Sequence, residues 1–119
     1  MNATVDIATA SRFVATIEDV EARRLGVNTI EARRAVASRC GIAPGTLENL
    51  RRERAKVVPH WIMARVRAAF IAILQSEIQR LEHDITIARQ VGLDDRDDDL
   101  AAAAAQLVAA KTLIAHSVR

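Results

Sequence analysis

A long row of apolar residues in the second half of the chain most constrains the fold. Seven of them recur at spacings of three or four: Val66, Phe70, Leu74, Ile78, Leu81, Ile85 and Ala88. This spacing is typical of one face of an α-helix and comes close to the period of coiled coils. It predicts one helix of about 30 residues with a continuous apolar seam, beginning near Pro59 and ending at Gly92.

The composition favours helices in the rest of the chain as well. The 119 residues include 23 Ala and 15 Arg, but only three aromatic residues and no Tyr. Helix formers are therefore abundant, whereas the residues that strands and turns prefer are scarce. We expect an all-α protein in which a compact head precedes a long antiparallel helical hairpin.

Capping and turn residues divide the first part of the chain. Residues 1–10 are expected to form a flexible arm, and Ser11 to cap a helix that Gly26 ends. Asn28 and Glu31 have the spacing of a capping box, so the next helix should begin directly after Asn28.

Helix-breaking and helix-starting residues predict two further helices. Gly41 should end the preceding helix, and Pro44 suits the first turn of a short helix that ends near Arg52. The acidic run at 94–99 should favour the start of a last helix at about residues 98–117. Because the link is short, this helix should fold back on the long helix.

These elements predict a head at residues 11–58 and a hairpin at residues 59–119 that joins copies of the chain. The last helix offers mainly Leu100, Leu107 and Ile114 to cover the seam. These side chains are too few to cover the whole seam, so we expect part of it to be exposed in a single chain and buried in a homo-oligomer, most simply a dimer. The predicted seam residues are Phe70, Leu74, Ile78, Leu81 and Ile85.

Charge is concentrated in the middle of the chain. Residues 21–69 hold eleven basic residues, ten of them Arg, against four acidic ones, whereas both flanks carry net negative charge. A basic cluster rich in Arg is typical of a surface that binds nucleic acid, because guanidinium groups can bind phosphates and bases in a bidentate way.

The stretch from Arg33 to Arg52 combines Ala37 with Gly41 four positions later. Two helices that cross steeply need a small residue at the crossing, and the tight turn between them needs a residue that tolerates positive φ. Residues in phase with both helices can form a shared core: Val36, Cys40, Ile42, Leu47 and Leu50. With these features the stretch resembles the helix-turn-helix of bacterial and phage regulators related to the lambda repressor and Cro.

This resemblance implies that residues from Pro44 to Arg52 form a recognition helix in the DNA major groove. The expected base contacts are Gly45, Thr46, Glu48, Asn49 and Arg52. The expected phosphate contacts are Arg33, Arg34, Arg51, Arg54 and Lys56. Glu48 has an alternative role, because it can pair with Arg52 four residues further on.

The resemblance implies a dimeric transcriptional regulator of a bacterial or mobile-element gene. Small terminase subunits of tailed phages are also similar, since in them a helix-turn-helix precedes a helical hairpin that builds a ring at the packaging site. A third interpretation is a protein-interaction module, such as an antiactivator, whose basic head binds an acidic partner.

Other chemistry finds little support in the sequence. Cys40 stands alone and fits a small core position, and His60, His83 and His116 lack the spacing of metal ligands. Trp61 is expected to pack where the long helix meets the head. No catalytic motif and no apolar run of about 18 residues is present. We therefore expect a cytoplasmic DNA-binding protein that is not an enzyme and has no cofactor, metal or membrane span.

Overall fold

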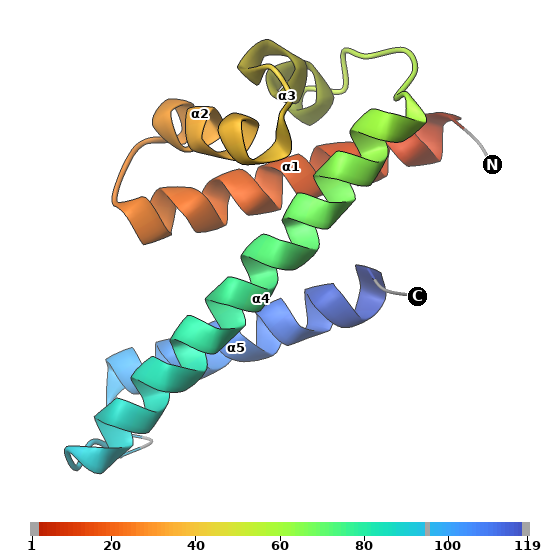
Figure 1. Cartoon of the computed structure of the whole chain (residues 1–119). Helices are drawn as coiled ribbons and strands as arrows, with labels where there is room; N and C mark the ends of the chain where they lie inside the picture. Colours follow the sequence, from red (N-terminus) through yellow and green to blue (C-terminus); the bar gives the residue numbers. More distant parts are fainter. Residues whose placement is uncertain (1–2, 95, 118–119) are drawn as a thin grey trace. The chain divides into compact units, whose positions relative to one another are not determined.

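The protein is built from five helices. The computed structural model describes residues 3–94 and 96–117, with side chains from Ile7 onward. The helices are α1 (Ala3–Leu25), α2 (Thr29–Cys40), α3 (Pro44–Arg51), α4 (His60–Gln90) and α5 (Asp98–Ser117) (Figure 1). The regular structure of the described residues is entirely helical, so the predicted all-α fold is confirmed.

The chain forms two compact units, whose boundary lies inside α4. The head unit spans Met1–Ile73 and the hairpin unit Leu74–Arg119. The head thus extends past the expected end at residue 58 because its core uses the first part of α4. There the rings of Phe13 and Phe70 stack with their centroids 4.2 Å apart.

Helix α1 is longer than predicted. It begins at Ala3, so the expected arm at residues 1–10 is helical from residue 3, while residues 1–2 lie outside the described part. The buried stripe starts before Ser11, since Ala10 is as deeply buried as Val14 and Ile17. Ser11 is not a helix cap; its hydroxyl donates a 2.7 Å hydrogen bond to the carbonyl oxygen of Arg51.

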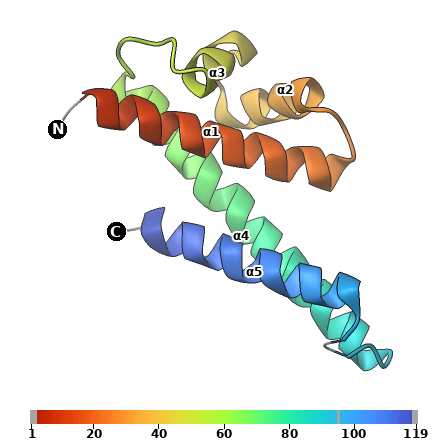
Figure 2. The same ribbon diagram turned by 180° about the vertical axis from the view of Figure 1, so that it is seen from behind.

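The core of the head forms where α1 packs against α2 and α3, as the two views of the ribbon also show (Figures 1 and 2). Its buried apolar side chains include Val14, Ile17, Val36, Leu47 and Leu50. The crossing residue Ala37 and the turn residue Ile42 are buried as well. The apolar residues predicted to join the two short helices therefore share one core.

The second unit is an antiparallel hairpin. Gly92 adopts a φ of 97° just after α4 ends, and the carboxylate of Asp97 caps α5 by accepting a 3.0 Å hydrogen bond from the Leu100 N–H. Both views show α5 lying alongside the second half of α4 (Figures 1 and 2). Lys111 on α5 pairs with Glu82 on α4 at 3.4 Å.

The seam of α4 is core within a single chain, which corrects the expectation that it is exposed. Leu74, Leu81 and Ile85 are buried, Ile78 is half-buried, and Phe70 belongs to the core of the head. A helix rich in Ala, such as α5, has short side chains that allow a neighbouring helix to come close, and this property accounts for the burial of the large seam residues.

The outward side of α5 remains apolar, with Val108 and Leu113 exposed. Among the described residues, α5 is the one helix long and apolar enough to cross a membrane by length and composition, and 11% of that stretch is buried. The core helices of soluble proteins can have the same length and apolar composition, so this feature is weak evidence for a membrane span.

Candidate nucleic-acid interface

A tight turn links α2 to α3. Asn28 caps α2, its side-chain oxygen accepting a 2.8 Å hydrogen bond from the Glu31 N–H, as predicted. At the other end Gly41 adopts a φ of 66°, and its N–H donates to the Ala37 carbonyl oxygen at 2.9 Å. Pro44 then stands in the first turn of α3, where its missing N–H leaves no hydrogen bond unmade.

The outward side of α3 carries most of the predicted base contacts. Leu47 and Leu50 are buried, and this leaves Gly45, Asn49 and Arg52 exposed. Thr46 and Glu48 are half-buried. Arg52 pairs with Glu48 at 3.4 Å, so the alternative interpretation of Glu48 as an ion-pair partner is confirmed.

Two of the five predicted phosphate contacts are held by a buried carboxylate. Glu18, on α1, is completely buried. It accepts hydrogen bonds from Arg33 of α2 at 2.7 and 3.2 Å and from Arg51 of α3 at 2.6 Å. Arg51 also lies 3.6 Å from Asp19. Their role at phosphates stays a prediction, but their charge is already compensated and joins three helices.

The pKa of the Arg33 guanidinium is raised, chiefly by its hydrogen bonds to Glu18, while burial opposes the shift. This buried Glu18–Arg33–Arg51 network fixes the position of α3 relative to α1 and α2. A second buried acid, Glu21, accepts from Arg24 at 2.8 Å and lies 3.5 Å from Arg39.

The other three predicted phosphate contacts are exposed. Arg34 lies on the outer side of α2, and Arg54 and Lys56 follow α3. Glu53 has a positive φ of 56°, and the Arg54 N–H then donates to the Asn49 carbonyl oxygen at 2.8 Å. This turn holds Arg54 against the end of α3 and beside the exposed Arg52.

Sequence reasoning missed the acidic side of this network. Glu18 and Glu21 sit in α1 beside the apolar positions Ile17 and Val20. An acidic residue in such a stripe must find a cation, because an unpaired buried charge is strongly destabilising. Acidic residues in the apolar stripe of α1, together with the many Arg residues of α2 and α3, therefore predict buried ion pairs between these helices.

Trp61 is 56% exposed, which corrects the expectation that it packs against the head. It lies in the first turn of α4, and the guanidinium carbon of Arg65 stands 5.2 Å from the centre of its ring. This cation–π contact occupies one side of the indole. Cys40, in contrast, is buried as predicted, and burial raises the pKa of its thiol although Arg39 and Arg65 act in the opposite direction.

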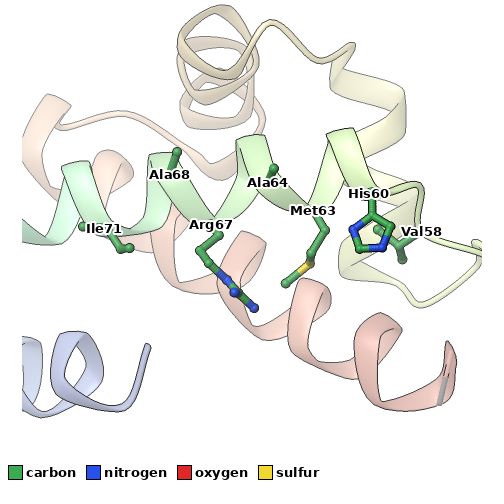
Figure 3. Close-up of a pocket in the computed structure, with 7 residues that line it drawn as sticks. All are labelled: Val58, His60, Met63, Ala64, Arg67, Ala68 and Ile71. Atoms are coloured by element: carbon green, nitrogen blue, oxygen red, sulfur yellow. The ribbon is translucent and has the colours of Figure 1, made fainter. Parts of the chain in front are cut away.

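A hollow of about 460 Å³ in the head runs along the first part of α4. Figure 3 shows the side chains that line it: Val58, His60, Met63, Ala64, Arg67, Ala68 and Ile71. None of the predicted DNA contacts is among them. Among the described residues its ionisable lining groups are His60 and Arg67, and both are exposed.

The chain matches no protein family, no curated protein and no solved structure. The assignment of a function therefore rests on the geometry of α2, the turn and α3.

Proposed function

We propose that the protein binds duplex DNA through a helix-turn-helix formed by α2 and α3, and that it acts as a transcriptional regulator. Asn49 reads adenine through two hydrogen bonds, and Arg52 reads guanine once it exchanges Glu48 for the base. Arg34, Arg54 and Lys56 bind phosphates on either side of the groove.

One observation carries the proposal: the inner side of α3 packs against the rest of the head, whereas its outer side is exposed to solvent. Its inner side is fixed by Leu47, Leu50 and the Glu18 network, whereas Asn49 and Arg52 are exposed. A helix that is rigidly placed and presents donors outward is what direct readout of base edges requires.

The proposal includes a dimer on the DNA. One recognition helix reads only a few base pairs, so two heads on a palindromic site give much better discrimination. Because most of the seam of α4 is buried within one chain, we place the contact between copies elsewhere on the surface. The mass of the protein in solution, measured by light scattering, decides this part of the proposal.

The experiment is a selection of bound duplexes from a random pool, followed by binding measurements over a range of salt concentrations. If a dimer neutralises about six phosphates, log K falls against log salt with a slope near −5. A slope shallower than about −2 would contradict the phosphate roles. No binding at low salt would favour a module that binds an acidic protein.

Two matched variants distinguish the loss of a base contact from the loss of one positive charge elsewhere on the protein. Arg52 and Arg96 are both exposed and both pair with a nearby carboxylate, Glu48 and Asp94 respectively. Arg52→Gln should lower affinity for the selected site by about 1–3 kcal/mol and relax the preference at one position. Arg96→Gln removes the same charge from the hairpin and should leave the selected sequence and its affinity unchanged.

A second candidate is a subunit of a phage packaging ring. The observation that favours it is the order of the parts, since the α2–α3 head is followed directly by the α4–α5 hairpin. Such a protein would also bind DNA but would assemble into a closed ring. The mass of a closed ring of more than four copies of the 13.0 kDa chain would support it, whereas a dimer or tetramer supports the regulator.

A further inference from the structure

A smaller hollow of about 250 Å³ lies beside the turn between α2 and α3. Two arginines stand at it, Arg39 from α2 and Arg65 from α4, and the remaining lining residues are Cys40, Ala68, Ala69 and Ala72. No acidic side chain lines it among the described residues. The alanine side chains are short, so they leave room for a group that reaches between the two guanidinium groups.

Arg65 is held in place by the turn itself. Its Nη1 donates to the Gly41 carbonyl oxygen at 3.0 Å, and its guanidinium lies near the ring of Trp61. A Cβ on residue 41 would lie 2.7 Å from that Nη1, so a larger residue would displace the guanidinium of Arg65. Glycine at position 41 therefore leaves room for Arg65 and also adopts the positive φ of the turn. Most of the five N–H donors of the guanidinium remain available.

The two arginines differ in their carboxylate partners. Within the described part of the chain Arg65 makes no ion pair, whereas Arg39 donates a long hydrogen bond of 3.5 Å to Glu21, which it shares with Arg24. Glu21 makes its shorter bond, 2.8 Å, to Arg24. The hollow therefore combines two cations with no competing anion inside it.

We propose that Arg39 and Arg65 together bind one backbone phosphate of the duplex, and this inference rests on the proposed DNA-binding function. A phosphodiester matches the site because two guanidinium groups can each donate two hydrogen bonds to its oxygens. Gly41 lies three residues before Pro44, so the phosphate would be bound next to the entrance of α3. The contact fixes how the recognition helix enters the groove without reading a base.

The test compares the salt dependence of DNA binding for the wild type, Arg39→Gln and Arg65→Gln. Because the two arginines share one phosphate, each variant should make the slope of log K against log salt shallower by up to about 1 per head. Each should also weaken binding about fivefold at 0.15 M salt. Arg67→Gln is the control, because it removes an exposed arginine from another side of α4 and should leave the slope unchanged. Circular dichroism confirms that each variant is folded.

Trp61 gives a second, independent measurement because it is the only Trp in the chain. Binding of a duplex should change its emission in the wild type, since Arg65 stands over its ring, and Arg65→Gln should remove most of that change. Inorganic phosphate up to about 50 mM tests whether a free anion occupies the site alone: a saturable emission change lost in both Gln variants would support it.

The inference and the proposed function fail in different ways. If the wild type binds DNA with a steep salt slope and both Gln variants keep that slope, the phosphate site is wrong and the helix-turn-helix assignment stands. If Arg65→Gln alone lowers affinity while the slope and the behaviour of Arg39→Gln stay unchanged, Arg65 only supports the turn and the site is also wrong. If the wild type does not bind duplex DNA, both proposals are wrong.

Discussion

The head and the hairpin place buried glutamates in different settings. In the head, Glu18 is bonded to arginines 15 and 33 residues away, on two other helices. In the hairpin, Glu77 is also buried, but its partner Arg80 is only three residues further along the same helix. One buried charge therefore joins helices, and the other supports a single helical turn.

The remaining polar contacts follow the same division. The head has a side-chain bond from Ser11 to the end of α3 and one from Arg65 to the turn at Gly41. Between the helices of the hairpin, the described ion pair joins Lys111 to Glu82, and both side chains are about half exposed. The head is thus specified by directional bonds, whereas the hairpin relies mainly on the shape of its apolar faces.

The largest expected effect comes from removing the charge of Glu18. Glu18→Gln leaves the mostly buried Arg33 without its carboxylate, and it leaves Arg51 with only the more distant Asp19. It should lower the stability of the head by about 3–5 kcal/mol. Glu77→Gln is the matched change in the hairpin and should lower its stability by about 1 kcal/mol or less. The smaller loss is expected because the exposed Arg80 is still hydrated and still pairs with Asp84. Urea unfolding, followed by Trp61 emission and by circular dichroism, measures both. Equal losses would contradict the comparison.

The seam of α4 provides the matching test for the hairpin. Leu81→Ala should destabilise this unit by about 2–4 kcal/mol because it opens a cavity in its core. Val108→Ala, on the exposed side of α5, should change the stability by less than about 0.5 kcal/mol. Sedimentation velocity should give the wild-type mass for both variants. A change of mass with unchanged helix content in Leu81→Ala would instead mean that the seam joins two copies.

Periodicity, caps and breakers predicted much of this fold because their causes are local. The limits of α5 and the start of α2 follow from short-range rules, and Gly41 and Pro44 mark the turn for steric reasons. The start of α1 was placed at Ser11, because a serine before apolar residues also fits a helix cap. Its hydroxyl instead finds a partner 40 residues away, which no local rule contains.

The candidate site was predictable only in part. The exposed positions of α3 follow from the phase of Leu47 and Leu50, which the sequence shows directly. The partners of Arg33 and Arg51 depend on how α1 crosses the other helices, and so does the burial of the seam. The hydrogen bond from Arg65 to the Gly41 carbonyl oxygen joins residues that are 24 positions apart, so it could be found only from the structure.

A buried alanine between packed helices is found in each unit, and replacing either one by a larger residue should lower the stability by a similar amount. Ala37 is buried where α2 meets its neighbours, and Ala110 is buried on the inner side of α5. Leu at either position should cost about 1–3 kcal/mol, because well-packed helices must move apart. Ala109→Leu is the control, since residue 109 is exposed. Thermal melts check the series, and DNA binding should fall only for Ala37→Leu. An unchanged melt for Ala37→Leu would contradict the assigned crossing.

The smallest effects should come from the helix caps, where the two units become equivalent. The side chain of Asn28 accepts the Glu31 N–H at 2.8 Å in the head, and that of Asp97 accepts the Leu100 N–H at 3.0 Å in the hairpin. A cap satisfies a donor of its own helix, so its energy does not depend on how the helices are joined. Asn28→Ala and Asp97→Ala should each cost about 1 kcal/mol. Urea unfolding of both variants measures this, with Ala102→Ser, on the exposed side of α5, as a control. A loss above about 3 kcal/mol for Asn28→Ala alone would mean that this cap, too, supports contacts between helices.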